Sequence, residues 1–155
     1  MHQPFVWDEC MDALAKTAQA LERLAELIPE ERWEVRPSPD RYSPKELVHH
    51  LLDVEEAFFR RYQQIAEEDH PTLSVYDPET APIDEQFSTG RLHDALKEFA
   101  EARQRSLDYL QQLPPEARDR TGIHPEFGEW SIFQQVHLWV AHDLLHLCDV
   151  ILRTR

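Results

Sequence analysis

Two histidines near the end of the chain, His142 and His146, have the spacing of a metal-binding pair. Residues four apart on an α-helix lie one turn above each other, with Cβ atoms about 5–6 Å apart, so both imidazoles can reach one ion. Solvated or core histidines can also fall at this spacing without a metal. A third histidine, His50, has an equivalent setting on another predicted helix. Three histidines leave coordination positions open, which is typical of a metal used for chemistry.

Helical phase separates these histidines from their neighbours. At about 100° per residue, His50 falls at the flank of the buried face of its helix, and His49 falls on the outward side, where a solvated surface histidine is expected. The same phase places His142 and His146 together beside the apolar stripe of the last helix, with His137 on the far side. We therefore predict that His50, His142 and His146 are the metal ligands.

Asp143 falls inside the apolar stripe of the last helix, which is unusual for a carboxylate. Burying a charge without compensation is costly, so an inward Asp143 requires a partner. It could orient a histidine through its ring N–H or act as a general base. The alternative is a partly exposed residue at one end of a bundle. The sequence contains no Gly-rich phosphate loop, no nucleophile elbow and no Glu-x-x-His pair ending at His142 or His146.

The elements that must position these residues are helices. The chain has only 3 Gly, and its 11 Pro cluster between long amphipathic stretches. Apolar residues recur at spacings of three and four in these stretches, which predicts helices. Ser43 with Glu46 and Ser131 with Gln134 form capping boxes, which are strong helix-start signals. The predicted helices cover about residues 8–28, 43–67, 92–113 and 131 to near the C-terminus.

Four such helices predict an all-α fold, a four-helix bundle, with residues 1–155 forming a single domain. A long connection, His70–Gly90, joins the second and third helices, and we expect it to cross over one end of the bundle. Glu116–Trp130 is expected to be a second loop.

The overall charge restricts the partners. The chain has 16 Lys+Arg against 30 Asp+Glu, a formal net charge of -14. Nucleic acids and anionic membranes require a basic face, so neither is expected as a partner. No run reaches transmembrane length, and the N-terminus lacks the basic and apolar regions of a signal peptide. We expect a cytoplasmic protein in which Cys10 and Cys148 are free thiols, with a disulfide between them as the alternative.

The last helix is also apolar on the face away from its core stripe. Leu138, Ala141, Leu145 and Cys148 follow that face. A helix that is apolar nearly all round is buried on all sides or lies at a subunit contact. We therefore expect a homodimer through this helix.

Two segments resemble the signatures of the DinB-like metalloprotein superfamily. The stretch from Ser43 to Glu55 carries His50 at the position of a family ligand, and the stretch from Trp130 to Ile151 carries the later H-x-x-x-H pair. The resemblance implies a four-helix bundle, often dimeric, in which three histidines hold a divalent metal. One departure is Asp149, where the family often has Gln.

The resemblance also implies an activity, since characterised relatives transfer or isomerise groups using low-molecular-weight thiols. Our first expectation is a metal-dependent enzyme that transfers such a thiol to a small electrophile. The alternatives are a metal-dependent hydrolase with Asp143 as base, and a non-catalytic metal-binding bundle that serves in dimerisation or binding. Zn²⁺ or Ni²⁺ is the expected ion, with Mn²⁺ or Fe as alternatives.

Overall fold

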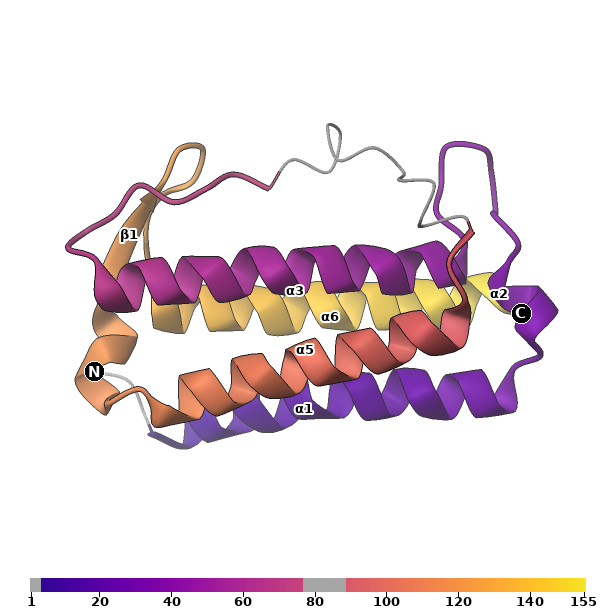
Figure 1. Ribbon diagram of the computed structural model, residues 1–155, viewed down its shortest axis with the longest axis horizontal. Helices are drawn as coiled ribbons and strands as arrows, with labels where there is room; N and C mark the ends of the chain where they lie inside the picture. The colour runs from indigo at the N-terminus through magenta and orange to yellow at the C-terminus, as the bar shows by residue number, and fades with distance from the viewer. Residues whose placement is uncertain (1–3, 77–88) are drawn as a thin grey trace.

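The computed structural model describes residues 4–76 and 89–155 and confirms the predicted four-helix bundle. Figure 1 shows the long helices side by side, and a short α-helix, a 3₁₀ helix and a two-stranded sheet complete the described elements. The long helices are α1 (Pro4–Leu27), α3 (Pro44–Glu67), α5 (Leu92–Gln112) and α6 (Ile132–Arg153). The short elements are α2 (Glu30–Trp33), η1 (Pro115–Asp119), β1 (Thr121–His124) and β2 (Gly128–Ser131).

The order of the helices around the bundle differs from their order in the chain. Helices α1 and α3 each pack against both α5 and α6, so they occupy opposite corners. Helices α1 and α6 run in one direction along the bundle, and α3 and α5 run in the other (Figure 1).

The long connection after α3 therefore joins opposite ends of the bundle, because α5 lies parallel to α3 (Figure 1). The prediction that it crosses over one end is wrong for this reason. Residues 77–88, which make up most of this connection, lie outside the described residues.

Both helices that carry the candidate ligands begin as the sequence predicts. The side chain of Ser43 accepts a hydrogen bond from the Glu46 backbone, and the Glu46 carboxylate accepts one from the backbone N–H of Ser43. Ser131 and Gln134 form the same capping box at the start of α6. Each box satisfies two backbone donors that a helix start would otherwise leave free. The helix starts, and hence the register of the site, are fixed locally.

The segment predicted as a second loop contains η1 and an antiparallel β-hairpin. Strand β1 pairs with β2, and Gly128 has a φ of 79° where the hairpin turns. Backbone hydrogen bonds of 2.8 Å tie β1 to the segment that follows α3. Gly122 permits this close approach, because a Cβ there would lie 2.8 Å from Cδ2 of Leu73 and 3.0 Å from Cγ1 of Ile65. The hairpin is thus seated against the end of α3.

The buried core consists of two apolar clusters along the bundle. One is built around Phe58, Tyr62 and Trp139, and the other around Leu51 and Phe99. The Arg103 guanidinium lies 4.9 Å from the Phe99 ring and 4.7 Å from the Trp139 ring, so it touches both clusters. Within the described residues, no helix is long and apolar enough to cross a membrane.

Candidate metal centre

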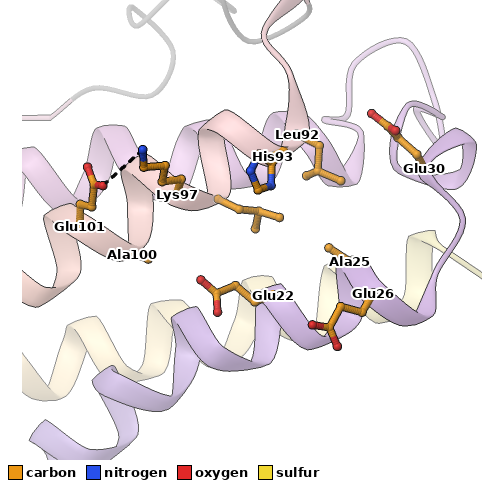
Figure 2. A pocket seen from close by; sticks show the side chains of 10 residues that line it. Glu22, Ala25, Glu26, Glu30, Leu92, His93, Lys97, Ala100 and Glu101 are labelled. Atoms are coloured by element: carbon orange, nitrogen blue, oxygen red, sulfur yellow. Dashed lines mark ion pairs between the residues drawn. The ribbon is translucent and has the colours of Figure 1, made fainter.

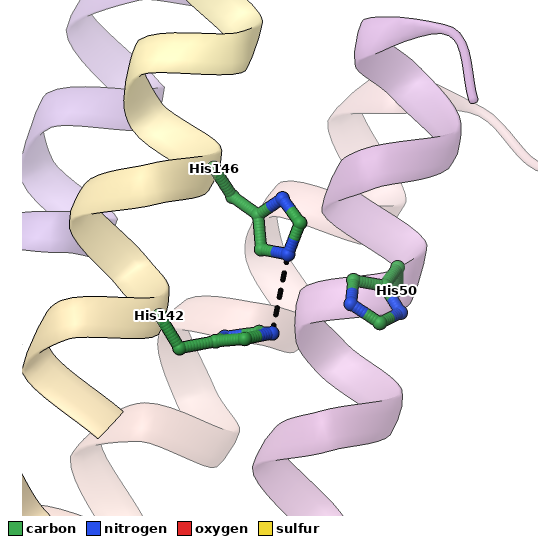
Figure 3. Close-up of side chains that lie close together, drawn as sticks. All are labelled: His50, His142 and His146. Carbon is green, nitrogen blue, oxygen red and sulfur yellow. Dashed lines mark hydrogen bonds between the residues drawn. The ribbon is translucent and has the colours of Figure 1, made fainter. Parts of the chain in front are cut away.

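The structure brings the three predicted histidines together. His50 extends from α3 toward His142 and His146 on α6 (Figure 3). One ring nitrogen from each residue lies within 4.8 Å of the others. The ring centroids are 4.4–5.4 Å apart, and the Nε2 atoms of His142 and His146 are 3.1 Å apart.

Burial keeps these imidazoles neutral. His50 is only 6% exposed, and burial lowers its pKa to about 3. Burial likewise lowers the pKa of His142 to about 4. The pKa of His146 is also lowered by burial, although the Asp149 carboxylate acts against this shift. An imidazole binds a metal only when it is neutral, so the donor set fits a divalent transition metal at neutral pH.

Polar groups outside the cluster lie near the other nitrogen, Nδ1, of two of the rings. The Tyr76 hydroxyl lies 3.3 Å from Nδ1 of His50. On α6, Nδ1 of His146 lies 3.4 Å from Oδ2 of Asp149, whose other oxygen lies 3.3 Å from the Arg153 guanidinium. Such contacts leave Nε2 of each ring for an ion. Asp149 and Arg153 stand three and seven residues after His146, a pattern that was readable in the sequence; Tyr76 had no local signal.

The other two histidines of these helices lie outside the cluster. His137 is exposed, with Nδ1 2.9 Å from the carbonyl oxygen of Phe133. His49, predicted to be solvated, is half-buried, and burial lowers its pKa. Charges on Lys45 and on Glu98 of α5 also act on this pKa, which places the ring on the α5 side of α3. The prediction of full solvation was wrong because α3 has a neighbour on each flank.

Asp143 is buried, as its position in the apolar stripe predicts, and its contacts are to other helices. Its Oδ2 accepts hydrogen bonds of 2.6 Å from both Thr17 and Arg103, and Oδ1 accepts one of 3.2 Å from Arg103. Arg103 also donates to Glu55 at 2.9 Å and to the backbone carbonyl of Leu14 at 2.7 Å. This ion network joins α1, α3, α5 and α6. Sequence reasoning missed Arg103 and Glu55, although both occupy core-facing positions of their helices.

A pocket of about 560 Å³ opens beside the histidines. His50 and His142 form one part of its lining, and the hairpin contributes His124 and Phe127. Arg61, from α3, lines it as well. The remaining lining residues are Tyr42, Val54, Ala57, Phe58, Tyr76 and Glu126.

A second pocket, of about 570 Å³, lies between α1 and α5 (Figure 2). Its charged and polar lining residues are all exposed, and Lys97 pairs with Glu101 at 3.9 Å. The charged and polar residues are Glu22, Glu26, Glu30, His93, Lys97 and Glu101. No three-residue metal-binding cluster was found here among the described residues.

The fold and the histidine cluster agree with comparisons to known proteins. The sequence profile of the DinB superfamily matches residues 13–149. The chain belongs to this superfamily, as the two signatures predict.

Two solved structures share the fold. YfiT from Bacillus subtilis is described as a probable metal-dependent hydrolase with an unusual four-helix bundle topology. It superposes with a TM-score of 0.91 over 100% of this chain and 89% of its own, at 18% identity. The DinB-like protein YjoA, also from Bacillus subtilis, has a TM-score of 0.61 at 18% identity, over 95% of this chain and 90% of its own.

A curated protein of Oceanobacillus iheyensis, named "putative metal-dependent hydrolase", is 27% identical over 110 residues. The match covers 70% of this chain and 63% of that protein.

Proposed function

We propose that His50, His142 and His146 bind one divalent metal ion, and that the protein is a metal-dependent enzyme acting on a small molecule held in the adjacent pocket. The convergence of three neutral imidazoles within 4.8 Å, with His50 buried and His142 and His146 half-buried, supports this proposal. Three protein ligands leave room for a water or a substrate atom, as in catalytic rather than structural sites. Zn²⁺ or Ni²⁺ is our first candidate for the ion, and Mn²⁺ or Fe the alternative.

We propose hydrolysis as the first reaction class, because YfiT and the curated relative are both named as metal-dependent hydrolases. When bound, such an ion supplies a nucleophile near neutral pH by lowering the pKa of a water or a thiol. Transfer of a low-molecular-weight thiol to a small electrophile is the second candidate. Its support is the apolar part of the pocket lining, including Val54 and Phe58, which suits a thiol better than water.

We infer that Asp143 positions the site and does not act as a general base. Both of its oxygens accept hydrogen bonds from cationic or hydroxyl donors. To accept a proton from a substrate, the carboxylate would have to give up a hydrogen bond from Arg103. The residue stands next to His142 in sequence and ties that part of α6 to α1 and α5. Asp143→Asn should lower activity about 10–100-fold through weaker or misaligned metal binding. A general base would instead cost about 10²–10⁴-fold at full metal occupancy.

Metal analysis and substrate panels test the proposal together. Purified protein should contain about one equivalent of metal, and activity per bound metal should be measured with esters and amides, and with thiols plus electrophiles. In cobalt-substituted protein, a thiolate ligand produces an intense charge-transfer band that water does not. Ester or amide turnover without any thiol effect on the spectrum would establish hydrolysis. A thiol-dependent band with thiol-dependent turnover would establish transfer.

We infer that the outer face of α6 meets a second copy of the chain. Leu138 and Leu145 are 41% and 60% exposed, and Leu152 is 58% exposed, all on one side of the helix. Exposed apolar side chains in such a stripe are typical of a subunit contact. Leu145→Glu should convert dimers to monomers in sedimentation at micromolar concentration, and a monomeric wild type would contradict the inference. A single domain over residues 1–155 and a cytoplasmic location remain predictions.

A further inference from the structure

Arg61 is a buried cation beside the histidine pocket. The residue is 7% exposed, and burial lowers its pKa. Its Nε donates to the carbonyl oxygen of Ser74 at 3.0 Å, and its guanidinium carbon lies 5.4 Å from the Phe58 ring. In the described ranges 4–76 and 89–155, no carboxylate lies within 4.0 Å of it, and its two terminal nitrogens have no hydrogen-bond partner. Because this largely buried guanidinium lines the pocket and has no paired carboxylate among the described residues, its terminal donors suit an anion from outside the chain.

A second donor faces the same pocket from the hairpin. His124 is 6% exposed, and its Nδ1 accepts hydrogen bonds from the backbone N–H groups of Glu126 and Phe127 at 3.2 and 3.4 Å. Because Nδ1 acts as an acceptor, the proton of the neutral ring sits on Nε2. Arg61 and His124 line the same pocket, and burial together with the charge of Arg61 lowers the pKa of His124. Glu126 is the only acidic residue among the described residues of the pocket lining, and it is exposed.

The other lining residues of the pocket indicate which kind of molecule bears the anionic group. Aromatic and aliphatic side chains, including Phe58 and Phe127, line the same pocket as these donors and the histidines, and the Phe127 ring stacks on His124. One guanidinium and one N–H donor match a carboxylate with its single charge and two oxygens. Apolar walls match an aryl or alkyl body.

We propose that Arg61 and His124 form a subsite for the carboxylate of an organic-acid substrate whose apolar body extends toward the three histidines. The subsite deepens the proposed function, since it names the substrate class of the same pocket. Arg61 and His124 are binding residues here, and the reacting bond lies at the histidine end of the molecule.

Calorimetric titration with simple probes tests the subsite. Phenylacetate, 3-phenylpropionate and 4-phenylbutyrate are compared with their neutral amides on zinc-loaded protein and on protein stripped by a chelator. At least one acid should bind about 10-fold or more tightly than its amide. Arg61→Gln should weaken the acid about 10–100-fold, the range for a hydrogen bond to a charged group, and leave the amide unchanged.

Matched variants separate binding from folding. Arg61→Lys keeps the charge but loses the planar fork, so it should recover part of the affinity. His124→Gln should weaken the acid by a smaller factor than Arg61→Gln. Arg60→Gln removes the same charge from an exposed neighbour and should have no effect. Thermal melts of each variant confirm that the fold is retained.

The metal-stripped protein distinguishes this subsite from the metal site. A preference for acids that survives stripping and depends on Arg61 supports the subsite, even if no metal-dependent turnover is ever found. Acid binding that vanishes with the metal and ignores Arg61→Gln would place the carboxylate on the ion and overturn the subsite, while the proposed metal site would stand. Equal binding of acids and amides, or no binding of either, would also overturn it.

Discussion

The α1–α5 pocket and the histidine pocket have almost the same volume, about 570 and 560 Å³, but their polar groups differ in exposure. In the α1–α5 pocket, charged residues such as Lys97 and Glu101 are exposed and hydrated, so keeping them costs little. In the histidine pocket, His50, Arg61 and His124 are more than nine-tenths buried. Burying polar groups is costly, so the buried polar groups rather than the pocket's size distinguish the candidate functional site.

The largest effect should come from the buried charge behind the site. Arg103 and Glu101 stand two residues apart on α5, one at the centre of the ion network and the other on the rim of the α1–α5 pocket. Arg103→Met would leave Glu55 and Asp143 buried without a cation, so unfolding free energy should fall by about 3–5 kcal/mol. Urea denaturation measures the change. Glu101→Gln is the matched control, and an equal loss in both variants would remove the distinction between the two environments.

Loss of metal binding should likewise separate the three clustered histidines from the other histidines of the chain. His50→Ala, His142→Ala and His146→Ala should each weaken metal affinity at least about 100-fold, more than the loss of an outer contact. Competition with a chromophoric chelator measures this affinity.

Three other histidines serve as controls for that comparison. His93 lines the α1–α5 pocket, and His49 and His137 lie on the helices that carry the predicted ligands. Each is replaced by alanine. All three should keep wild-type stoichiometry. If metal binding requires His49 and not His50, the assignment of His50 as a ligand from α3 is wrong.

Acidification should destabilise the metal-free histidine pocket. His50 has a pKa of about 3 in the folded protein, below its ordinary value of 6.5, so the unfolded chain binds the proton more readily. The stability of the metal-free protein is therefore greatest above about pH 6.5 and falls as the pH drops toward 3. His50 alone should account for a loss of about 2 kcal/mol between pH 7 and pH 5. Urea unfolding at pH 7 and pH 5 measures the loss. His50→Gln should remove that contribution, and an unchanged pH dependence in this variant would contradict the assignment.

The smallest effect is expected in the α1–α5 pocket. Lys97→Ala removes an exposed ion pair with Glu101 and should change the unfolding free energy by less than about 0.5 kcal/mol. Activity and metal content should stay at wild-type levels. A loss of either would mean that this pocket contributes to function, and that exposure of the polar groups does not separate the two pockets.

Helical periodicity and capping carried most of the sequence prediction. The phase of α3 separated His50 from His49 because a helix repeats at a nearly constant angle, and the capping boxes at Ser43 and Ser131 fixed where both site helices begin. The burial of Asp143 followed from its stripe position.

What the sequence left open depends on contacts between distant segments. Arg103 faces Asp143 across the bundle, and no local rule states which helix lies opposite which. The hairpin has one clear turn residue, Gly128, in a segment otherwise typical of a loop. Arg61 and His124 are far apart in the sequence and line one pocket only because the hairpin folds back against α3.

Gly122 sets how closely the hairpin packs against α3 and the segment that follows it. No side chain stands between β1 and the pair Leu73 and Ile65, so the strand rests directly on them, two residues before His124. A single methyl group at residue 122 would collide with the Leu73 and Ile65 side chains, so either these side chains shift or the strand moves away from α3 and carries His124 with it. A substitution at residue 122, outside the pocket lining, could therefore change the depth of the pocket without replacing any lining residue. This offers evolution or an engineer a route to larger substrates.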